Sequence, residues 1–330
     1  MTATRQHYEE DSNDKIWFSC IASKGFPLKV FHDGSASFLT RTTIHLTKEG
    51  IRIRDDDATG DDSVSEVLFD LFLHREKFLQ YNCYEELLLS YNTKHMKGLL
   101  KSVKKKDSVS LEILDPGEGK KIEKMYIVVM PEGASGKCSR TERYYLAVQE
   151  EDVGEYEMCV LPEDHYHHPI VIQSADFQKL KKFSNVSKPT TISVKAQAGN
   201  YLEFQSDSGS VSGGEMTFGK LLKNPKKIDL RHTEIECGTN EYPYMYVAKF
   251  SGTTLSQLTK FGGLEKRMQI FAPEIDGYPL KISMEAGDSG NLGIFTAFIK
   301  DKRQIDYERS EHEKELGIDI DRKVISKKKK

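Results

Sequence analysis

The chain has 330 residues, of which 38% are apolar and 30% are charged, a composition typical of a globular protein with about two domains. No apolar run approaches the roughly 20 residues that a membrane span needs, and the first 14 residues are polar, so we expect no membrane partner and no secretory signal. The net charge is −3, from 48 Lys and Arg against 51 Asp and Glu, which argues mildly against a nucleic-acid-binding protein. The five cysteines are odd in number and have no metal-site or redox spacing, which favours a reducing compartment.

Two patterns follow one another along the first half: apolar residues three or four apart, which predict helices, and strict alternation, which predicts strands. In chain order we predict a disordered segment over 1–14, a helix over 26–39, a hairpin over 42–57, strands within 64–91, a helix over 94–105, strands over 108–114 and 124–130, a polar loop over 131–143 and a strand over 144–148. Gly34 weakens the middle of the first helix.

The second half repeats this order of elements, with negligible sequence identity between the halves. We predict a helix over 175–186, a hairpin over 190–208 that turns at Gly199 and Asn200, short strands to 250, a helix over 254–262 and strands over 267–272, 279–286 and 292–299. This indicates an α+β fold of two similar domains, each with antiparallel sheets and two helices on one face. The domains span 15–148 and 167–302, with a connector over 149–166 and a charged tail over 303–330.

The enzyme motifs in the sequence are incomplete, so we predict no catalytic residues, no metal and no cofactor. Residues 287–290 (Gly-Asp-Ser-Gly) resemble a protease nucleophile loop, but no histidine has the matching context. Residues 214–220 resemble a phosphate-binding loop, but Leu221 stands where a magnesium-binding hydroxyl is needed. Three nearby histidines in a polar loop, His165, His167 and His168, are more often solvated than metal-bound.

All four predicted helices carry lysine outside the apolar stripe, although the whole chain is slightly acidic. If the helices line one surface, these lysines form a basic track that attracts phosphates without reading bases. Few aromatic residues lie on these faces, which favours a duplex backbone over stacked single strands. The candidate DNA-binding residues are Lys29, Lys97, Lys101, Lys104, Lys105, Lys179, Lys182, Lys260, Lys266 and Arg267.

Short motifs add to this pattern. Residues 161–166 (Leu-Pro-Glu-Asp-His-Tyr) resemble the Ile-Pro-Glu-x-x-Tyr end of an interdomain connector, and residues 278–280 and 288–292 resemble the last two strands of the same family. Residues 96–101 resemble its second helix, and Phe177-x-Lys179-x-x-Lys182 resembles the first helix of its second domain. Over about residues 15–302 the chain thus resembles the DNA sliding clamps of the proliferating cell nuclear antigen family, as a distant or a viral member. It departs from the family at Gly34, in the segment 131–143, at Gln197 and in the lysine-ended tail.

The resemblance implies a ring of identical subunits around double-stranded DNA, without a cofactor, that acts as a DNA polymerase processivity factor. Its implied partners are DNA polymerase and other replication proteins, each bound through a short peptide motif, and a clamp loader. The implied location is the nucleus, or a cytoplasmic viral factory for a viral protein. The implied peptide pocket consists of Leu68, Leu161, Pro162, Tyr166, Pro279 and Ala297.

Two apolar alternating segments, 125–130 and 215–218, are candidates for unpaired sheet edges. The resemblance implies that they join subunits head to tail into a homotrimer. The interface residues would be Ile127, Val129, Met216 and Phe218. The alternatives are one subunit of a hetero-oligomeric checkpoint clamp, a viral processivity factor that forms no ring and, in another class, a hydrolase that uses the glycine-rich segments.

Overall fold

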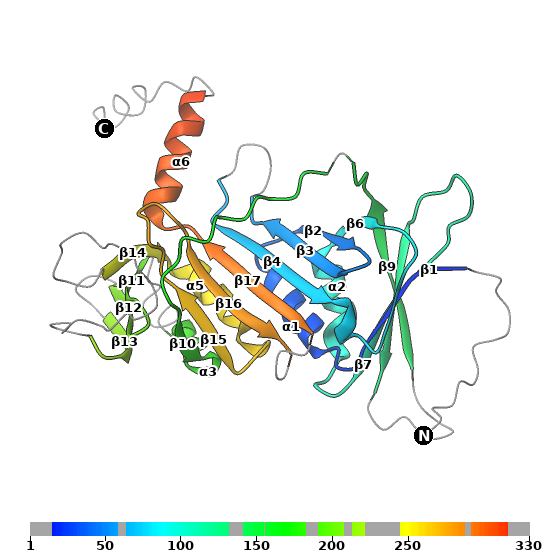
Figure 1. Ribbon diagram of the computed structural model, residues 1–330, viewed down its shortest axis with the longest axis horizontal. Coiled ribbons are helices and arrows are strands. Elements are labelled where there is room, and N and C mark those ends of the chain that lie inside the picture. Colours follow the sequence, from blue (N-terminus) through cyan, green and yellow to red (C-terminus); the bar gives the residue numbers. More distant parts are fainter. Residues whose placement is uncertain are drawn as a thin grey trace, which may run out of the picture.

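The fold is known from a computed structural model, which describes residues 15–58, 64–131, 141–154, 156–182, 191–207, 213–221, 245–287 and 292–315. Most of the strands belong to one antiparallel sheet (Figure 1). Its strands, in spatial order, are β10 (Ile170–Gln173), β15 (Arg267–Phe271), β16 (Leu280–Ala286), β17 (Gly293–Ile299), β4 (Val67–His74), β3 (Gly50–Asp56), β2 (Arg41–Leu46), β6 (Leu87–Asn92), β9 (Glu142–Glu150), β8 (Lys124–Met130), β7 (Ser108–Leu114), β1 (Ile16–Ala22) and β5 (Gln80–Cys83).

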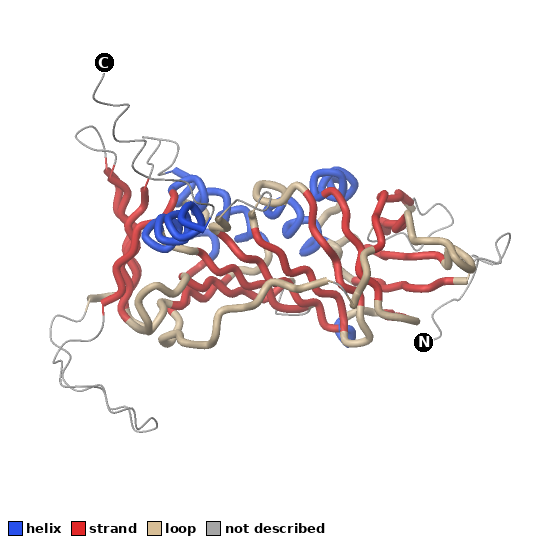
Figure 2. Tube along the Cα trace, turned by 90° about the horizontal axis from the view of Figure 1, so that it is seen from above, coloured by secondary structure: helices blue, strands red, loops and turns tan. Residues whose placement is uncertain are grey.

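A second antiparallel sheet has the order β13 (Gly213–Gly219), β12 (Tyr201–Asp207), β11 (Thr191–Gln197) and β14 (Met245–Ser251). The α-helices of the described residues are α1 (Phe26–Ser35), α2 (Thr93–Leu99), α3 (Ser174–Phe177), α5 (Gly252–Leu258) and α6 (Lys302–Glu315), and the 3-10 helices are η1 (Arg75–Lys77), η2 (Leu100–Ser102) and η3 (Thr259–Gly263). Most helical segments lie along one side of the strands (Figure 2). The protein is therefore a mostly-β, α+β protein, as the alternating pattern predicted. Within the described part of the chain, no helix has the length and apolar character needed to cross a membrane.

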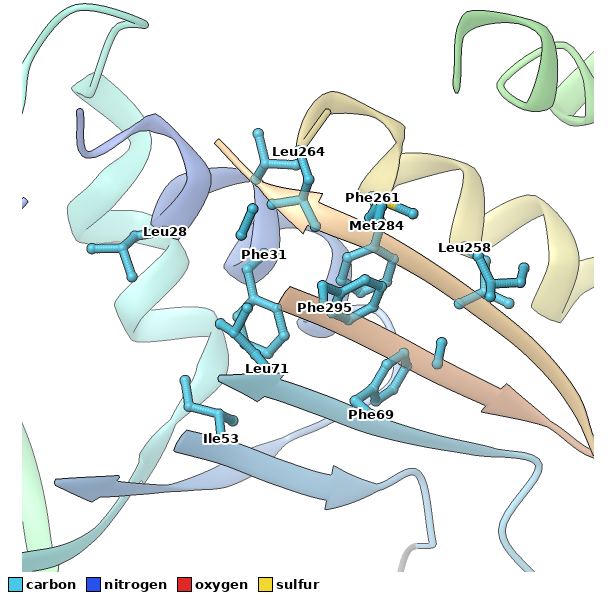
Figure 3. Packing of buried hydrophobic residues seen from close by; sticks show 14 of the residues in the cluster. Leu28, Phe31, Ile53, Phe69, Leu71, Leu258, Phe261, Leu264, Met284 and Phe295 are labelled. Atoms are coloured by element: carbon cyan, nitrogen blue, oxygen red, sulfur yellow. The ribbon is translucent and has the colours of Figure 1, made fainter. Parts of the chain in front are cut away.

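The two halves of the chain share the large sheet, because β17 pairs with β4 along its whole length, from Gly293 opposite Leu73 to Ile299 opposite Val67. Aromatic rings from both halves pack on the helix side of this junction (Figure 3). Phe261 of η3 stacks on Phe295 of β17 with ring centroids 4.5 Å apart, and Phe31 of α1 lies 5.9 Å from Phe295. The halves therefore share one hydrophobic core.

The predicted helices are present but shorter than the sequence indicated. The helix predicted over 26–39 ends at Ser35, and the one over 94–105 ends as η2, so Lys104 and Lys105 lie beyond it. In place of one helix over 175–186 the structure has the four-residue α3 followed by helical residues 180–182, and residues 183–186 lie outside the described part. The helix over 254–262 is α5 continued by η3.

Side-chain caps explain where two helices begin. The side chain of Asn92 accepts a hydrogen bond from the His95 amide at the start of α2, and the Ser251 hydroxyl accepts one from the Thr254 amide at the start of α5. Each cap residue is also the last residue of the preceding strand, β6 or β14. A strand, a cap and a short helix thus follow one another in both halves.

Elements that were not predicted include β1, β10 and α6. The last of these occupies the start of the predicted tail and extends away from the sheets (Figure 1). It is attached at its base, where Ile305 is buried and the Gln304 side chain donates a hydrogen bond to the Gly277 carbonyl.

Candidate functional site

Lysines from both halves of the chain meet on the helix side of the sheet. The Lys29 ammonium on α1 donates a hydrogen bond to the Lys101 carbonyl in η2 (2.5 Å). Burial, together with the ammonium groups of Lys97 on α2 and Lys181 after α3, lowers the pKa of Lys260 in η3. The Asp33 carboxylate has the opposite effect on the Lys260 pKa, so three ammonium groups and one carboxylate lie near one another here.

Two of the ten predicted DNA-binding residues, Lys97 and Lys260, therefore belong to one group, and Lys181, which was not predicted, joins them. Lys29 and Lys101 contact each other, through the Lys101 carbonyl. The signal for Lys181 was present, since it stands between two predicted members, Lys179 and Lys182. The other predicted residues are exposed at the margins of the helices, and the structure does not place them within this group: Lys104, Lys105, Lys179, Lys182, Lys266 and Arg267. Lys179 is already paired with Asp176 at 2.5 Å.

A second feature lies on the opposite side of the sheet, where one row of residues crosses four strands. Phe271 of β15 lies opposite Lys281 of β16, Lys281 opposite Phe298 of β17, and Phe298 opposite Leu68 of β4. Residues directly opposite one another share a face of the sheet, and neighbours along a strand lie on the other face. Since Phe295 of β17 packs against the helices, Phe298 and its row face away from them.

The connector between the halves holds Tyr166 over this row. It runs from β9 to β10 past the ends of β4 and β17 (Figure 1). The His167 amide donates a hydrogen bond to the Ala272 carbonyl (3.0 Å), and the Glu274 amide donates one to the His165 carbonyl (2.9 Å). These backbone bonds on both sides of Tyr166 fix its position against the sheet.

The resulting aromatic cluster consists of Tyr166, Phe271, Tyr278 and Phe298, with Lys281 at its centre. The Tyr166 ring lies 6.4 Å from Phe271, 6.4 Å from Tyr278 and 6.3 Å from Phe298, measured between centroids. The Lys281 ammonium lies 5.0 Å from the Tyr166 and Phe271 ring centroids and 6.0 Å from that of Phe298. Burial raises the pKa of Tyr166, so the phenol stays protonated at all ordinary pH values.

Only part of the predicted peptide pocket lies at this cluster. Tyr166 belongs to it, and Leu68 extends its row, whereas Leu161 and Pro162 are half-buried in the connector. Pro279 is half-buried directly before β16. Ala297 does not belong to this cluster, because it lies opposite Phe69 on the helix side and is fully buried.

Four members of the cluster were not predicted: Phe271, Tyr278, Lys281 and Phe298. One signal was available in the alternation of β16, where Lys281 is followed by Ile282, so the two point to opposite faces. Which other strands supply residues beside Lys281 depends on non-local pairing, which alternation does not reveal.

The two segments predicted to be unpaired sheet edges, 125–130 and 215–218, differ in their strand pairing. Strand β8 pairs with both β7 and β9, so it is not an edge, and Ile127 and Val129 are buried core residues. In contrast, β13 is an edge strand of its sheet among the described residues, and Met216 and Phe218 are half-buried on it. Within the described residues, β5 ends the large sheet in the first half, and β9 also has an open side, because its residues 142–147 pair with β8 alone.

No metal site is evident in the part of the chain that the structure describes, which contains no group of three or more His, Cys, Asp and Glu residues placed to hold an ion. The segment that resembles a phosphate-binding loop forms β13, a strand rather than a loop that leads into a helix. The resemblance of 287–290 to a nucleophile loop falls mostly outside the described residues.

No protein-family model matches the chain, and no curated protein matches it either.

Proposed function

We propose that the helix side of the protein binds the phosphate backbone of duplex DNA, and that the protein is a sliding clamp that acts as a DNA polymerase processivity factor. The observation that carries this proposal is the closeness of Lys97, Lys181 and Lys260, although they come from helical segments far apart in the chain. Mutual repulsion among ammonium groups costs free energy, and a phosphate bound between them would relieve it.

A clamp needs to enclose its DNA, and the junction within the chain suggests how two copies would join. The ladders β1-β7-β8-β9 and β10-β15-β16-β17 follow the same order, as do β2-β3-β4 and β11-β12-β13. We interpret these as a repeated unit, in which β9 corresponds to β17 and β13 corresponds to β4. Since β17 pairs with β4, the edge of β9 in one copy would pair with β13 in the next.

Equivalent positions in the two halves fix the register of this pairing. The caps Asn92 and Ser251 lie opposite the first residue of β2 and of β11, respectively. From these equivalent residues, the strand pairing leads across β2, β3 and β4 in the first half and across β11, β12 and β13 in the second. Met216 and Leu71 then occupy equivalent positions.

The same counting gives the register of the other edge. It runs from the start of α2 to β7 and across β8 to β9, and from the start of α5 to β15 and across β16 to β17. Tyr144 is then the counterpart of Ala297. Ala297 lies opposite Phe69, whose counterpart is Gly214, so Tyr144 would lie opposite Gly214, and Arg143 opposite Glu215. Opposite charges that face each other across two strands stabilise their pairing. Glycine leaves room for the tyrosine ring.

In this arrangement the partner proteins would bind on the outer side of the sheet, and a tethered polymerase would re-encounter the DNA as if intramolecularly. The partners proposed are duplex DNA, DNA polymerase and other replication proteins, a clamp loader and further copies of the chain, in the nucleus or in a viral factory.

Fluorescence anisotropy with two labelled duplexes of unrelated sequence tests the DNA-binding face. The variant Lys97→Glu/Lys181→Glu/Lys260→Glu should lose binding to both duplexes alike. The variant Lys77→Glu/Lys120→Glu/Lys121→Glu has the same change in net charge at exposed positions elsewhere and should keep most of it. For the wild type, the logarithm of the affinity should fall with log salt by about 0.9 per neutralised phosphate. Equal losses in the two variants, or a strong preference for one duplex, contradict the proposal.

A further inference from the structure

Two tyrosines lie side by side on a face of the large sheet that the proposed function does not use. Tyr126 of β8 is directly opposite Tyr145 of β9, so the two share a face. Glu142 of β9 accepts a hydrogen bond from the Ser102 hydroxyl in η2 (3.2 Å), and side chains alternate along a strand, so Tyr145 lies on the side away from the helices. Tyr145 is 62% exposed and Tyr126 is half-buried. The pair therefore forms an aromatic surface on the outer face of β8 and β9.

Each of the two rings has a cation over it, supplied by the other strand. The Arg143 guanidinium carbon on β9 lies 4.5 Å from the Tyr126 ring centroid, and the Lys124 ammonium on β8 lies 5.4 Å from that of Tyr145. Such contacts favour one orientation of both side chains, so rings and charges are held together at the surface.

The acid nearest to these cations holds only one of them, and weakly. Glu112 of β7 lies 3.4 Å from the Arg143 guanidinium, whose side chain is 50% exposed. Ion pairs that face water contribute little, because solvent screens them and the side chains lose freedom. A phosphate from another molecule could therefore replace Glu112 at small cost.

A hollow of about 560 Å³ opens beside Tyr126, large enough to hold a small organic group. Its lining comprises Tyr126, three lysines, several apolar side chains and two acids, Asp115 and Glu123. The Asp115 carboxylate accepts a hydrogen bond from the Gly117 amide (2.8 Å), which holds it within its own turn. The hollow thus extends the aromatic surface and carries a small excess of positive charge.

Flat aromatic rings interleaved with cations fit unpaired nucleotides. A base can stack on a tyrosine ring or on a guanidinium plane, and the phosphates on either side of it are attracted by the cations. In a duplex the bases are already stacked on one another, so only a single strand can offer their flat faces. The helix side differs in this respect, because its lysines lie among few aromatic residues.

We propose that the outer face of β8 and β9 binds single-stranded nucleic acid, with bases stacked on Tyr126 and Tyr145. Lys124 and Arg143 would contact the adjoining phosphates. Pairing of β9 with another copy would occupy the edge of the strand and leave this face open. The inference does not depend on whether the helix side binds duplex DNA.

Fluorescence anisotropy with labelled 12-residue strands of deoxythymidine or uridine tests this face. The full-length variant Lys97→Glu/Lys181→Glu/Lys260→Glu serves as the parent protein, because it removes the charge of the helix side. Adding Tyr126→Ala/Tyr145→Ala should weaken binding about tenfold or more, since each stacked base contributes on this scale. Adding Tyr126→Phe/Tyr145→Phe keeps the rings and should restore it. Tyr307→Ala, at an exposed tyrosine of α6, is the control and should not change the affinity.

A strand of the same length and charge, with abasic sites in place of the bases, separates stacking from attraction of phosphates. It should bind the parent protein about tenfold more weakly than the thymidine strand, and this difference should disappear in the Tyr126→Ala/Tyr145→Ala variant. A structural effect of the two alanines alone would not remove the dependence on bases. The tighter of the thymidine and uridine strands identifies the sugar that the site prefers.

The proposal is wrong if neither strand binds the parent protein, if the abasic strand binds as well as the thymidine strand, or if the two alanines leave the affinity unchanged. If the alanine variant fails to fold, the comparison of the abasic and thymidine strands on the parent protein still decides the matter. Duplex binding is measured separately, through lysines on the other side of the sheet, so a failure here would not affect the proposed function.

Discussion

Gly34 lies in the last turn of α1, where its missing side chain makes room for the Phe261 ring of the other half. A Cβ atom added at Gly34 would lie 2.7 Å from two atoms of that ring. Gly34→Ala should therefore lower the free energy of unfolding by about 1–2 kcal/mol, because crowding in the core outweighs the gain of about 1 kcal/mol in helix propensity. Chemical denaturation measures this change.

Gly98 is the matched control for that substitution. It lies in α2, and an added Cβ would meet no atom within 4 Å. Gly98→Ala should accordingly stabilise the protein by up to about 1 kcal/mol. If both substitutions stabilise, the close contact between the halves at Phe261 is not as described.

Asp55 makes stability depend on pH in an unusual direction. Burial raises the pKa of its carboxyl from 3.8 to about 6, so the folded protein holds the proton more tightly than the unfolded chain does. Its contribution to stability is present below pH 4 and is lost as the pH rises through 6, an effect of up to about 3 kcal/mol. Asp55→Asn should then gain stability relative to the wild type between pH 4 and pH 7, as measured by thermal unfolding across this range. A constant difference would contradict this.

In the proposed assembly, copies of the chain associate through the edges of β9 and β13. The proposed register places Arg143 of one copy opposite Glu215 of the next. Arg143→Glu on β9 would face Glu215 of the neighbouring copy, and this like-charge pair should weaken self-association about tenfold. The combination of Arg143→Glu with Glu215→Arg should restore it, because opposite charges again face each other. Arg303→Glu, at an exposed arginine of α6, is the control. Light scattering at several concentrations measures the effect, and failure of the double variant to recover would reject the register.

At the scale of elements, the sequence predicted what is local and missed what is not. The hairpins were correct, since alternation and turn residues such as Gly199, with φ of 66°, are local signals. The prediction that segment 125–130 is an unpaired edge was wrong. The alternation in β8 indicates which of its residues are buried, but it does not reveal that β9 pairs with its second side. Helix α6 has no apolar stripe, and its buried Ile305 becomes visible as an anchor only when the sheet beneath it is known. Likewise the lysines were predicted from helical faces, whereas the aromatic cluster required the pairing of four strands.

For the whole molecule, the proposal predicts a closed assembly of three subunits. In the part of the chain that the structure describes, β9 and β13 each have an open side that could pair with another copy, and two repeated units per chain would give six units per ring. Light scattering at micromolar concentration should give three times the mass of the chain. A stable monomer without DNA would reject the closed ring and favour a viral processivity factor that forms no ring. A monomer that assembles only with different chains would favour the checkpoint clamp.

The pairing of β4 with β17 also constrains how the chain is made. The two strands are separated by more than 200 residues, so β4 has no partner on one side until nearly the whole chain has left the ribosome. Contacts this distant in sequence form slowly, and an open strand edge can pair with another chain in the meantime. Synthesis that stops before residue 293 would therefore release a first half with an uncovered apolar edge, a species prone to aggregate and dependent on chaperones.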